Sequence, residues 1–375
     1  IMITVILKTT DGCNLRCRYC SMGKKELQFH TMDVRTLKKA GDYAVSFCKH
    51  QALEEIQFIL HGGEPVLVDT DTYRQFFEYM RMKYPRVKCT YAMQTNGYLI
   101  SKHFLQLIID YNISVGISID GGKCVQDYTR PDIIGNGSYD RVFHTIKKLR
   151  EENVAVSALT VVTKKLLIDN FDYISQFNKL KVGLKINPLL KTGEAVASPE
   201  LWLQQGEYAE YLISVYRYIL ENEIEIQVNP ISDIMNALIS NRPLNDCAYN
   251  RHCGKRFVCI DFKGDIYPCG RFDSIDGACV GNIFDEKPPL TIFTHKPLDE
   301  KCSMCKYVRF CNGGCSAYRE MSKDEINPMC TDTQILLHYF STEGMSLYIK
   351  YLSTIRDKKL HTYMEYTHME DTLNV

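Results

Sequence analysis

The sequence of 375 residues has no excess of either charge, because 45 lysines and arginines balance 45 aspartates and glutamates. Zero formal net charge argues against a broad basic face for nucleic acid or an anionic membrane, and neither is expected as a partner. The sequence also lacks an apolar run of roughly 18 residues or more and a cleavable signal peptide. We therefore expect a soluble, cytoplasmic protein. No internal repeat is visible.

Cysteine, by contrast, is abundant, with 16 residues in the chain. A disulfide framework and metal ligation are the two explanations for such a count. In the reducing compartment expected here, clustered cysteines indicate metal ligands. Clusters that solvent can reach are easily oxidised, which fits an anaerobic host.

Three cysteines, Cys13, Cys17 and Cys20, follow the first apolar run on a short loop. A cubane iron-sulfur cluster is usually held by four cysteines, so three would leave one iron open. An open position invites a ligand that is not protein, as in a catalytic zinc site. The alternative is a zinc knuckle, but no nearby His or Cys supplies the fourth ligand that zinc usually takes.

The spacing C-x3-C-x2-C, with Tyr19 before the last cysteine, resembles the signature of radical S-adenosylmethionine (SAM) enzymes. The resemblance implies that the open iron binds SAM and that an electron from the cluster cleaves it to a 5′-deoxyadenosyl radical, which abstracts hydrogen from substrate. It also implies that His61-Gly62-Gly63-Glu64-Pro65 is the G-G-E-P motif, which binds the SAM amino group. The residues assigned to SAM in this way are Tyr19, Gly62, Gly63, Glu64, Ser118, Asp120, Arg130 and Leu189.

Residues 1–190 alternate strand-like and helix-like segments. The expected strands are 3–9, 55–61, 88–94, 114–120, 154–162 and 181–188, and the expected helices are 33–50, 71–83, 101–111, 139–152 and 166–177. Six β-α repeats predict an α/β fold with a parallel sheet curled into an open barrel. The resemblance implies that this is the partial (β/α)6 radical SAM barrel. Its active site is expected beyond the carboxyl ends of the strands, where the cysteine loop also lies.

The rest of the chain divides into three parts by composition. Residues 191–243 are expected to be a mostly helical connection, with one long helix over 199–223. Residues 244–331 contain ten cysteines with Gly and Pro turns, and they predict a small second domain stabilised by metal. Residues 332–375 are expected to form a helix to about residue 355 and then a polar tail.

The cysteines of the second domain are spaced as Cys302-x2-Cys305-x5-Cys311-x3-Cys315, followed by Cys330. This pattern resembles the SPASM domain of radical SAM enzymes that modify peptides and proteins. The resemblance implies two auxiliary 4Fe-4S clusters, and therefore three in all. It assigns Cys247, Cys253, Cys269 and Cys315 to the first auxiliary cluster and Cys302, Cys305, Cys311 and Cys330 to the second. A zinc ribbon is the alternative. The other five cysteines, expected as small core residues, are Cys48, Cys89, Cys124, Cys259 and Cys279. Cys259 and Cys279 are also alternatives to a misassigned cluster ligand.

The layout is similar to that of anaerobic sulfatase-maturating enzymes, which oxidise a Cys or Ser to formylglycine. Those enzymes carry a base aspartate directly after Y-P-C, whereas here Tyr267-Pro268-Cys269 is followed by Gly270. Asp273 is the candidate for a replacement base, and Asp276 is a second aspartate within reach of the same space.

The missing aspartate favours the other large SPASM class, which crosslinks ribosomally made peptides by thioether or carbon-carbon bonds. Formylglycine formation stays as the first alternative, small-molecule radical chemistry as a second, and a non-catalytic iron-sulfur or zinc scaffold as the alternative of another class. The expected partners are a peptide or protein substrate and a reductant such as flavodoxin or ferredoxin. Because the first strand begins at residue 3, a leader peptide would be held by the barrel, by residues 191–243 or by a separate protein.

Overall fold

The computed structural model describes residues 2–23, 29–322 and 326–353. Within these residues, one sheet runs in the order β10-β9-β8-β1-β2-β3-β4-β5-β6-β7. The six predicted barrel strands are confirmed and lie side by side in parallel. Their bounds are β1 Met2–Lys8, β2 Glu55–His61, β3 Lys88–Thr95, β4 Ser114–Ser118, β5 Val156–Val162 and β6 Gly183–Pro188.

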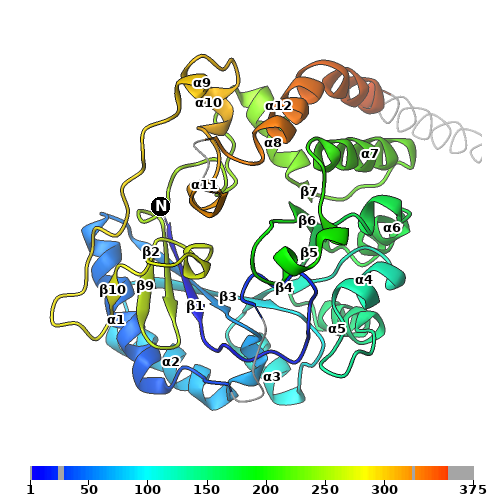
Figure 1. The fold of residues 1–375 in the computed structure, drawn as a ribbon. Helices are drawn as coiled ribbons and strands as arrows, with labels where there is room; N and C mark the ends of the chain where they lie inside the picture. The colour runs from blue at the N-terminus through cyan, green and yellow to red at the C-terminus, as the bar shows by residue number, and fades with distance from the viewer. Residues whose placement is uncertain (1, 24–28, 323–325, 354–375) are drawn as a thin grey trace, which may run out of the picture.

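Helices cover the outer side of this curved sheet (Figure 1). They are α1 Val34–His50, α2 Thr70–Lys83, α3 Lys102–Asp110, α4 Lys123–Thr129, α5 Tyr139–Glu151 and α6 Asp172–Lys179. The N-terminal residues Asp33 and Ser101 accept hydrogen bonds from the first turns of α1 and α3, which fixes where these helices begin. The sequence analysis did not predict α4, which is short.

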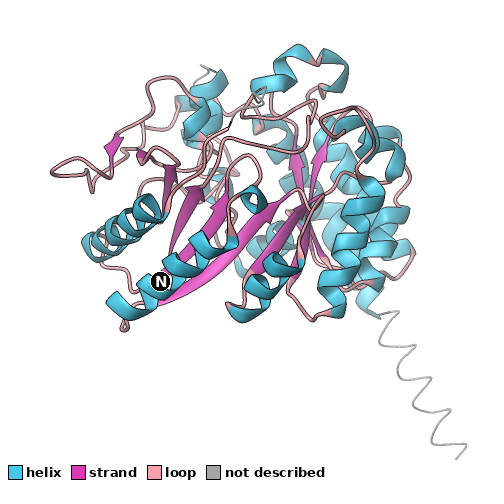
Figure 2. Ribbon diagram, turned by 90° about the horizontal axis from the view of Figure 1, so that it is seen from below, coloured by secondary structure: helices cyan, strands magenta, loops and turns pink. Residues whose placement is uncertain are grey.

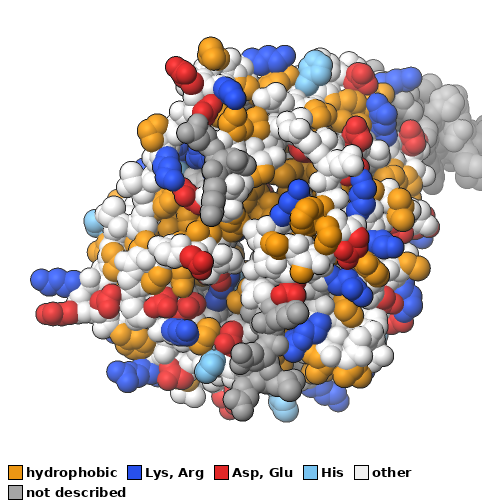
Figure 3. Space-filling view, in the orientation of Figure 1, with side chains coloured by type: hydrophobic (Ala, Val, Ile, Leu, Met, Phe, Trp, Pro, Cys, Tyr) orange, Lys and Arg blue, Asp and Glu red, His pale blue; other side chains and the backbone are white. Residues whose placement is uncertain are grey.

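The two faces of β1 show how the sheet divides core from interior. Ile3, Val5 and Leu7 are fully buried in the core beneath the helices. The alternate residues point to the concave side, where Lys8 at the strand's end reaches across to Asp273. Hydrophobic side chains gather around a hollow near the middle of the face drawn in Figure 3. The carboxyl ends of the strands therefore open onto an interior space.

Two predicted helices are wrong in extent, and a particular residue lies at each break. The helix predicted over 166–177 is a 3-10 turn, Leu166–Ile168, followed by α6. Between them Asp169 is extended, and its carboxylate accepts a hydrogen bond from Gly122 N at 2.7 Å. The long helix predicted over 199–223 begins as a 3-10 turn, Pro199–Leu201, and α7 covers only Glu207–Glu221. Gly206, with a φ of 93°, separates the two.

The connection contains one strand that the sequence did not predict. The connection begins with a 3-10 turn, Gly193–Ala197, and continues through α7. The strand β7, Val228–Asn229, comes next and pairs in parallel with β6. Helix α8, Ile231–Ser240, follows it.

Strands of the cysteine-rich segment extend the barrel sheet. β8, Phe257–Asp261, pairs in parallel with β1, and β9, Asp265–Tyr267, and β10, Gly281–Asn282, continue antiparallel. Figure 2 shows the continuity of the sheet from below. Short 3-10 turns lie at Pro65–Leu67 and Phe272–Ser274. The predicted second domain is thus joined to the first through β1.

The helices of the C-terminal part are short until the last one. They are α9 Glu300–Ser303, α10 Val308–Cys311, α11 Ser316–Ser322 and α12 Cys330–Tyr339. A π-helical turn, Phe340–Gly344, continues α12, and the chain stays helical to residue 353. The polar tail predicted over 356–375 lies outside the described residues. None of the described helices is long and apolar enough to cross a membrane.

Candidate active site

The cysteine loop follows β1 and brings its three thiols together. Burial raises the pKa of Cys13 to about 11 and that of Cys17 to about 12, and Cys20 adds to both rises through its charge. Nitrogen donors approach two of the sulfurs, since Asn96 Nδ2 lies 3.7 Å from Cys13 Sγ and Arg130 Nη1 lies 3.9 Å from Cys17 Sγ. A cation and polar donors beside buried thiols favour the thiolate form that metals bind.

Gly62 and Gly63, after β2, pack directly against this loop. Gly63 N donates to Thr10 O at 2.8 Å, and Glu64 N donates to Gly12 O at 2.7 Å. A Cβ on Gly63 would lie 1.9 Å from Gly12 O, and Gly62 has a φ of +133°. The sequence analysis attributed these glycines to contact with a ligand. In the structure these glycines also allow the loop after β2 to pack closely against the cysteine loop.

Glu64 is fully buried and joins the ends of β2 and β3. Its carboxylate accepts hydrogen bonds from Thr95 Oγ1 at 2.6 Å and from Asn96 N at 2.7 Å. Burial raises the pKa of Glu64 to about 7, although these hydrogen bonds act to lower it. Asn96, on the loop after β3, also donates from Nδ2 to Asn14 Oδ1 at 2.8 Å. The three loops after β1, β2 and β3 are therefore tied together.

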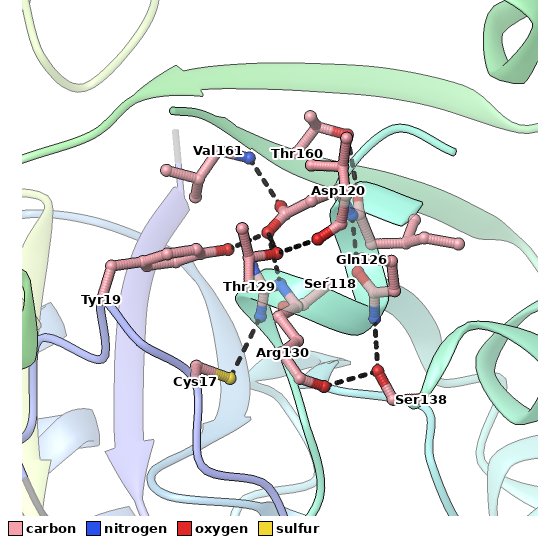
Figure 4. Close-up of polar contacts among 12 residues, drawn as sticks. Cys17, Tyr19, Ser118, Asp120, Gln126, Thr129, Arg130, Ser138, Thr160 and Val161 are labelled. Carbon is pink, nitrogen blue, oxygen red and sulfur yellow. Dashed lines mark hydrogen bonds and ion pairs between the residues drawn. The ribbon is translucent and has the colours of Figure 1, made fainter. Parts of the chain in front are cut away.

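Asp120 is the centre of a second buried network (Figure 4). Its Oδ2 accepts hydrogen bonds from Thr129 Oγ1 at 2.8 Å, from Arg130 Nε at 3.1 Å and from the Tyr19 hydroxyl. Its Oδ1 accepts from Val161 N at 3.0 Å. The Arg130 guanidinium lies 5.1 Å from the Tyr19 ring centre, over its face. Burial acts to lower the pKa of Arg130, but Asp120, Tyr19 and Cys17 together outweigh it and raise that pKa.

Two further predicted residues lie close by. Ser118 Oγ accepts a hydrogen bond from Gln94 Nε2 at 3.1 Å. Leu189 is buried in one apolar cluster with Tyr19, Ala195 and Leu201. The structure thus gathers the residues assigned to SAM around the cysteine loop. Thr95 and Asn96 were not assigned to SAM, but their place in a polar-glycine motif after β3 pointed to this face of the sheet.

The first set of auxiliary cysteines also comes together. Cys253, Cys269 and Cys315 pack in one cluster, and Cys247 is near enough to affect the ionisation of Cys253. Arg271 Nη1 donates to Cys247 Sγ at 3.2 Å. The sequence analysis did not single out Arg271, whose position two residues after Cys269 was the only available signal.

The second set surrounds one cavity of about 130 Å³. Its lining includes Cys302, Cys305, Cys311 and Cys330. In the described residues, no group of three or more His, Cys, Asp or Glu side chains is placed to hold a single metal ion. Cubane ligands need not meet at one point, because each iron takes one cysteine.

All 16 cysteines lie in the described residues and none forms a disulfide, and five lie outside these three sets. Cys48 and Cys259 are buried core residues as predicted, and Cys89 is partly buried. The prediction is wrong for Cys124 and Cys279, which are exposed.

The candidate base Asp273 lies on the concave side of the sheet, with its carboxylate against Lys8 Nζ. The side chains of this ion pair are only 5% and 11% exposed, for Lys8 and Asp273 respectively. A Cβ on Gly270 would lie 3.8 Å from Lys8 Cε. A side chain at position 270 would therefore point toward the lysine that Asp273 already contacts.

His61 is the neighbour of Lys8 across the sheet, at the end of β2. Its Nδ1 accepts a hydrogen bond from Gly62 N at 2.7 Å. Burial, followed by the charge of Lys8, lowers the pKa of His61 to about 4. The ring is therefore neutral near pH 7, with its proton on Nε2.

Comparison with known proteins identifies the first part of the chain. Residues 7–177 match the family model described as the Radical SAM superfamily. These residues form a radical SAM domain. The match includes the cysteine loop, Glu64 and the Asp120 network, so the geometry above lies within the radical SAM domain.

The radical SAM domain is part of a longer similarity. A cysteine-type anaerobic sulfatase-maturating enzyme of Clostridium novyi is 26% identical over 341 residues, covering 84% of this chain and 88% of the relative. A serine-type enzyme of Klebsiella aerogenes is 24% identical over 317 residues, covering 82% and 78%. The chain is homologous to anaerobic sulfatase-maturating enzymes.

Solved structures share the fold. The structure of anSMEcpe with bound AdoMet and a Cp18Cys peptide has a TM-score of 0.75 and 23% identity, covering 94% of this chain and 99% of that one. Streptococcus suis SuiB bound to S-adenosylmethionine has a TM-score of 0.60 and 17% identity, covering 86% and 75%. The α/β barrel followed by a cysteine-rich part is thus confirmed.

Proposed function

We propose that this radical SAM enzyme modifies a peptide or protein by oxidising a Cys or Ser side chain. In this proposal Cys13, Cys17 and Cys20 hold a 4Fe-4S cluster, and a reductant such as flavodoxin or ferredoxin supplies its electron. When bound, the cluster and SAM together supply a radical that removes one hydrogen atom from a substrate C–H bond. Side chains of this protein would carry out the remaining steps.

The cofactor site is proposed around the loops after β1 to β4. The clustered thiols, with Asn96 and Arg130 donating toward two of them, fit a cluster held by three cysteines. Glu64 offers a buried carboxylate suited to the SAM amino group. Arg130 offers a guanidinium suited to its carboxylate. Asp120 holds Arg130 and Tyr19 in position through its hydrogen bonds.

The observation that carries the choice of reaction is the Lys8–Asp273 ion pair on the concave face. After the Cβ–H bond breaks, the S–H or O–H bond of the substrate must break as well. Its proton would pass to the Asp273 carboxylate, and one electron would pass to the auxiliary clusters. A serine then becomes the aldehyde directly, whereas a cysteine becomes a thioaldehyde that water converts to the aldehyde with release of hydrogen sulfide. Lys8 fixes the carboxylate by donating to it.

A specific observation supports a second candidate, crosslinking of a peptide. Gly270 stands where the sulfatase-maturating resemblance expects an aspartate. If Asp273 does not act as the base, the carbon radical would instead bond to a sulfur or carbon of another residue in the peptide. That residue's S–H or C–H bond would break, its proton would pass to another base, and one electron would pass to the auxiliary clusters.

The test separates hydrogen abstraction from oxidation. Asp273→Asn is incubated, reduced and with its clusters reconstituted, with SAM and a peptide containing one Cys or Ser. Loss of a general base typically costs about 10²–10⁴-fold, so the aldehyde product should fall by that factor while 5′-deoxyadenosine still forms. Hydrazide labelling and mass spectrometry measure the aldehyde.

Moving the carboxylate provides the matched control. Gly270→Asp together with Asp273→Asn restores an aspartate beside Lys8, where the new Cβ would touch Ile6 Cδ1 at 3.2 Å and require only a small shift. We expect this double variant to regain aldehyde formation. Full aldehyde formation by Asp273→Asn alone would overturn the role of Asp273, and a crosslinked product from the unmodified protein would favour the second candidate.

A further inference from the structure

Arg271 is the charged residue at the first set of auxiliary cysteines. Its Nη1 donates to Cys247 Sγ at 3.2 Å. Its guanidinium carbon lies 5.0 Å from the centre of the Tyr318 ring, over the ring face. Cys269 and Cys315 also lie near enough for their charges to act on Arg271. The guanidinium is therefore held among the thiols by a hydrogen bond and a ring contact.

No carboxylate forms an ion pair with Arg271 in the part of the chain that the structure describes. The acidic group that acts on it, Asp246, is already paired with Lys185 at 2.6 Å. A partly buried cation needs a compensating negative charge. Four cysteine thiolates around a cluster would supply that charge.

The second set of cysteines has a different donor. Gln334 Nε2 lies 3.4 Å from Cys330 Sγ and 3.9 Å from Cys305 Sγ. An amide is neutral, and Gln334 is exposed. The two sets thus differ in the charge of the group that donates to their sulfurs.

We propose that Arg271 is a positioning residue that raises the reduction potential of the first auxiliary cluster, so that this cluster is the acceptor of the electron lost by the substrate radical. The inference rests on the proposed function, because it takes these cysteines as cluster ligands. Reduction potentials of iron-sulfur clusters depend on net charge, on hydrogen bonds to sulfur and on solvent exposure. A cation that donates to Cys247 stabilises the reduced, more negative state. Accepting the electron involves no bond change at Arg271.

The test measures potentials rather than activity. In full-length protein with Cys13, Cys17 and Cys20 replaced by Ala, only the two auxiliary clusters should remain, with about eight irons per chain at four per cubane. A redox titration followed by electron paramagnetic resonance then gives two reduction steps. Arg271→Gln is compared with Arg271→Lys, which keeps the charge, and with Arg309→Gln, which removes an exposed charge that stacks on Phe310.

We expect Arg271→Gln to shift one of the two steps to a more negative potential and to leave the other in place. Arg271→Lys should recover most of that shift, and Arg309→Gln should move that step little. An unchanged pair of steps in Arg271→Gln, or equal shifts of both, would overturn the role of Arg271. A background protein without iron would instead show that these cysteines are not cluster ligands and would overturn the cluster assignment itself.

Discussion

Lys8 and Asp273 form an ion pair although 265 positions separate them in the chain. The contact exists because β8 pairs in parallel with β1, which brings the segment after Cys269 over the concave face of the barrel. It joins the radical SAM domain to the cysteine-rich part at the point where we propose that the substrate loses its proton.

Replacing Lys8 by Met should destabilise the protein, because it leaves the buried Asp273 carboxylate without its partner. The loss of one member of a buried pair typically costs about 3–5 kcal/mol of unfolding free energy. Denaturant unfolding measures the change. Lys88→Met is the matched control, since Lys88 pairs with Glu55 on the exposed end of β3, and it should change little. Equal effects of the two substitutions would contradict a buried pair.

Asp120→Asn should weaken the structure around Tyr19 and Arg130. The Asp120 side chain is inaccessible to solvent, and the substitution leaves the Arg130 guanidinium facing a neutral amide. We expect a loss of about 3–5 kcal/mol in unfolding free energy, together with weaker SAM binding. Asp140→Asn removes a carboxylate from an exposed pair with Lys123 and serves as the control. If the two variants unfold alike, Asp120 does not hold this network together.

Gly63→Ala should separate the loop after β2 from the cysteine loop. The added methyl group would lie 1.9 Å from Gly12 O, which is backbone and has little room to move. We expect reconstituted Gly63→Ala protein to hold about four fewer irons per chain than the unmodified protein, as for loss of one cubane. Gly183→Ala adds its methyl group 3.9 Å from the nearest atom and should keep its iron. Normal iron and SAM binding in Gly63→Ala would refute this packing.

Stability should depend on His61 in mildly acidic solution. The pKa of His61 is about 4 in the folded protein and about 6.5 when unfolded, so the unfolded chain binds the proton first. Stability from this group is present above pH 6.5 and is lost as the pH falls toward 4. His61→Asn should therefore reduce the slope of unfolding free energy against pH between about 6.5 and 5.5, by up to about 1.4 kcal/mol per pH unit. Exposed His144→Asn is the control, and an unchanged slope in His61→Asn would contradict the assignment.

The sequence revealed those parts of the structure that depend on neighbours in the chain. The six parallel strands could be predicted because short apolar runs alternate with amphipathic ones, and the cysteine loop because its spacing is local. The break at Gly206 was missed because a glycine inside a helical pattern does not by itself show a left-handed conformation.

Contacts between distant segments could not be predicted in the same way. The pairing of β8 with β1 and the Arg271–Cys247 hydrogen bond depend on how the chain returns to the barrel, which no residue spacing encodes. Asp273 was named as a possible base from its distance to Cys269 along the chain. Its partner Lys8 became visible only in the folded structure.

Incubation of the reduced, reconstituted protein with SAM and a peptide containing one Cys or Ser tests the account most directly. The account predicts that 5′-deoxyadenosine and a peptide aldehyde accumulate together, from protein that holds about twelve irons per chain at four per cubane. If protein with full iron and a strong reductant forms no 5′-deoxyadenosine, the account is contradicted.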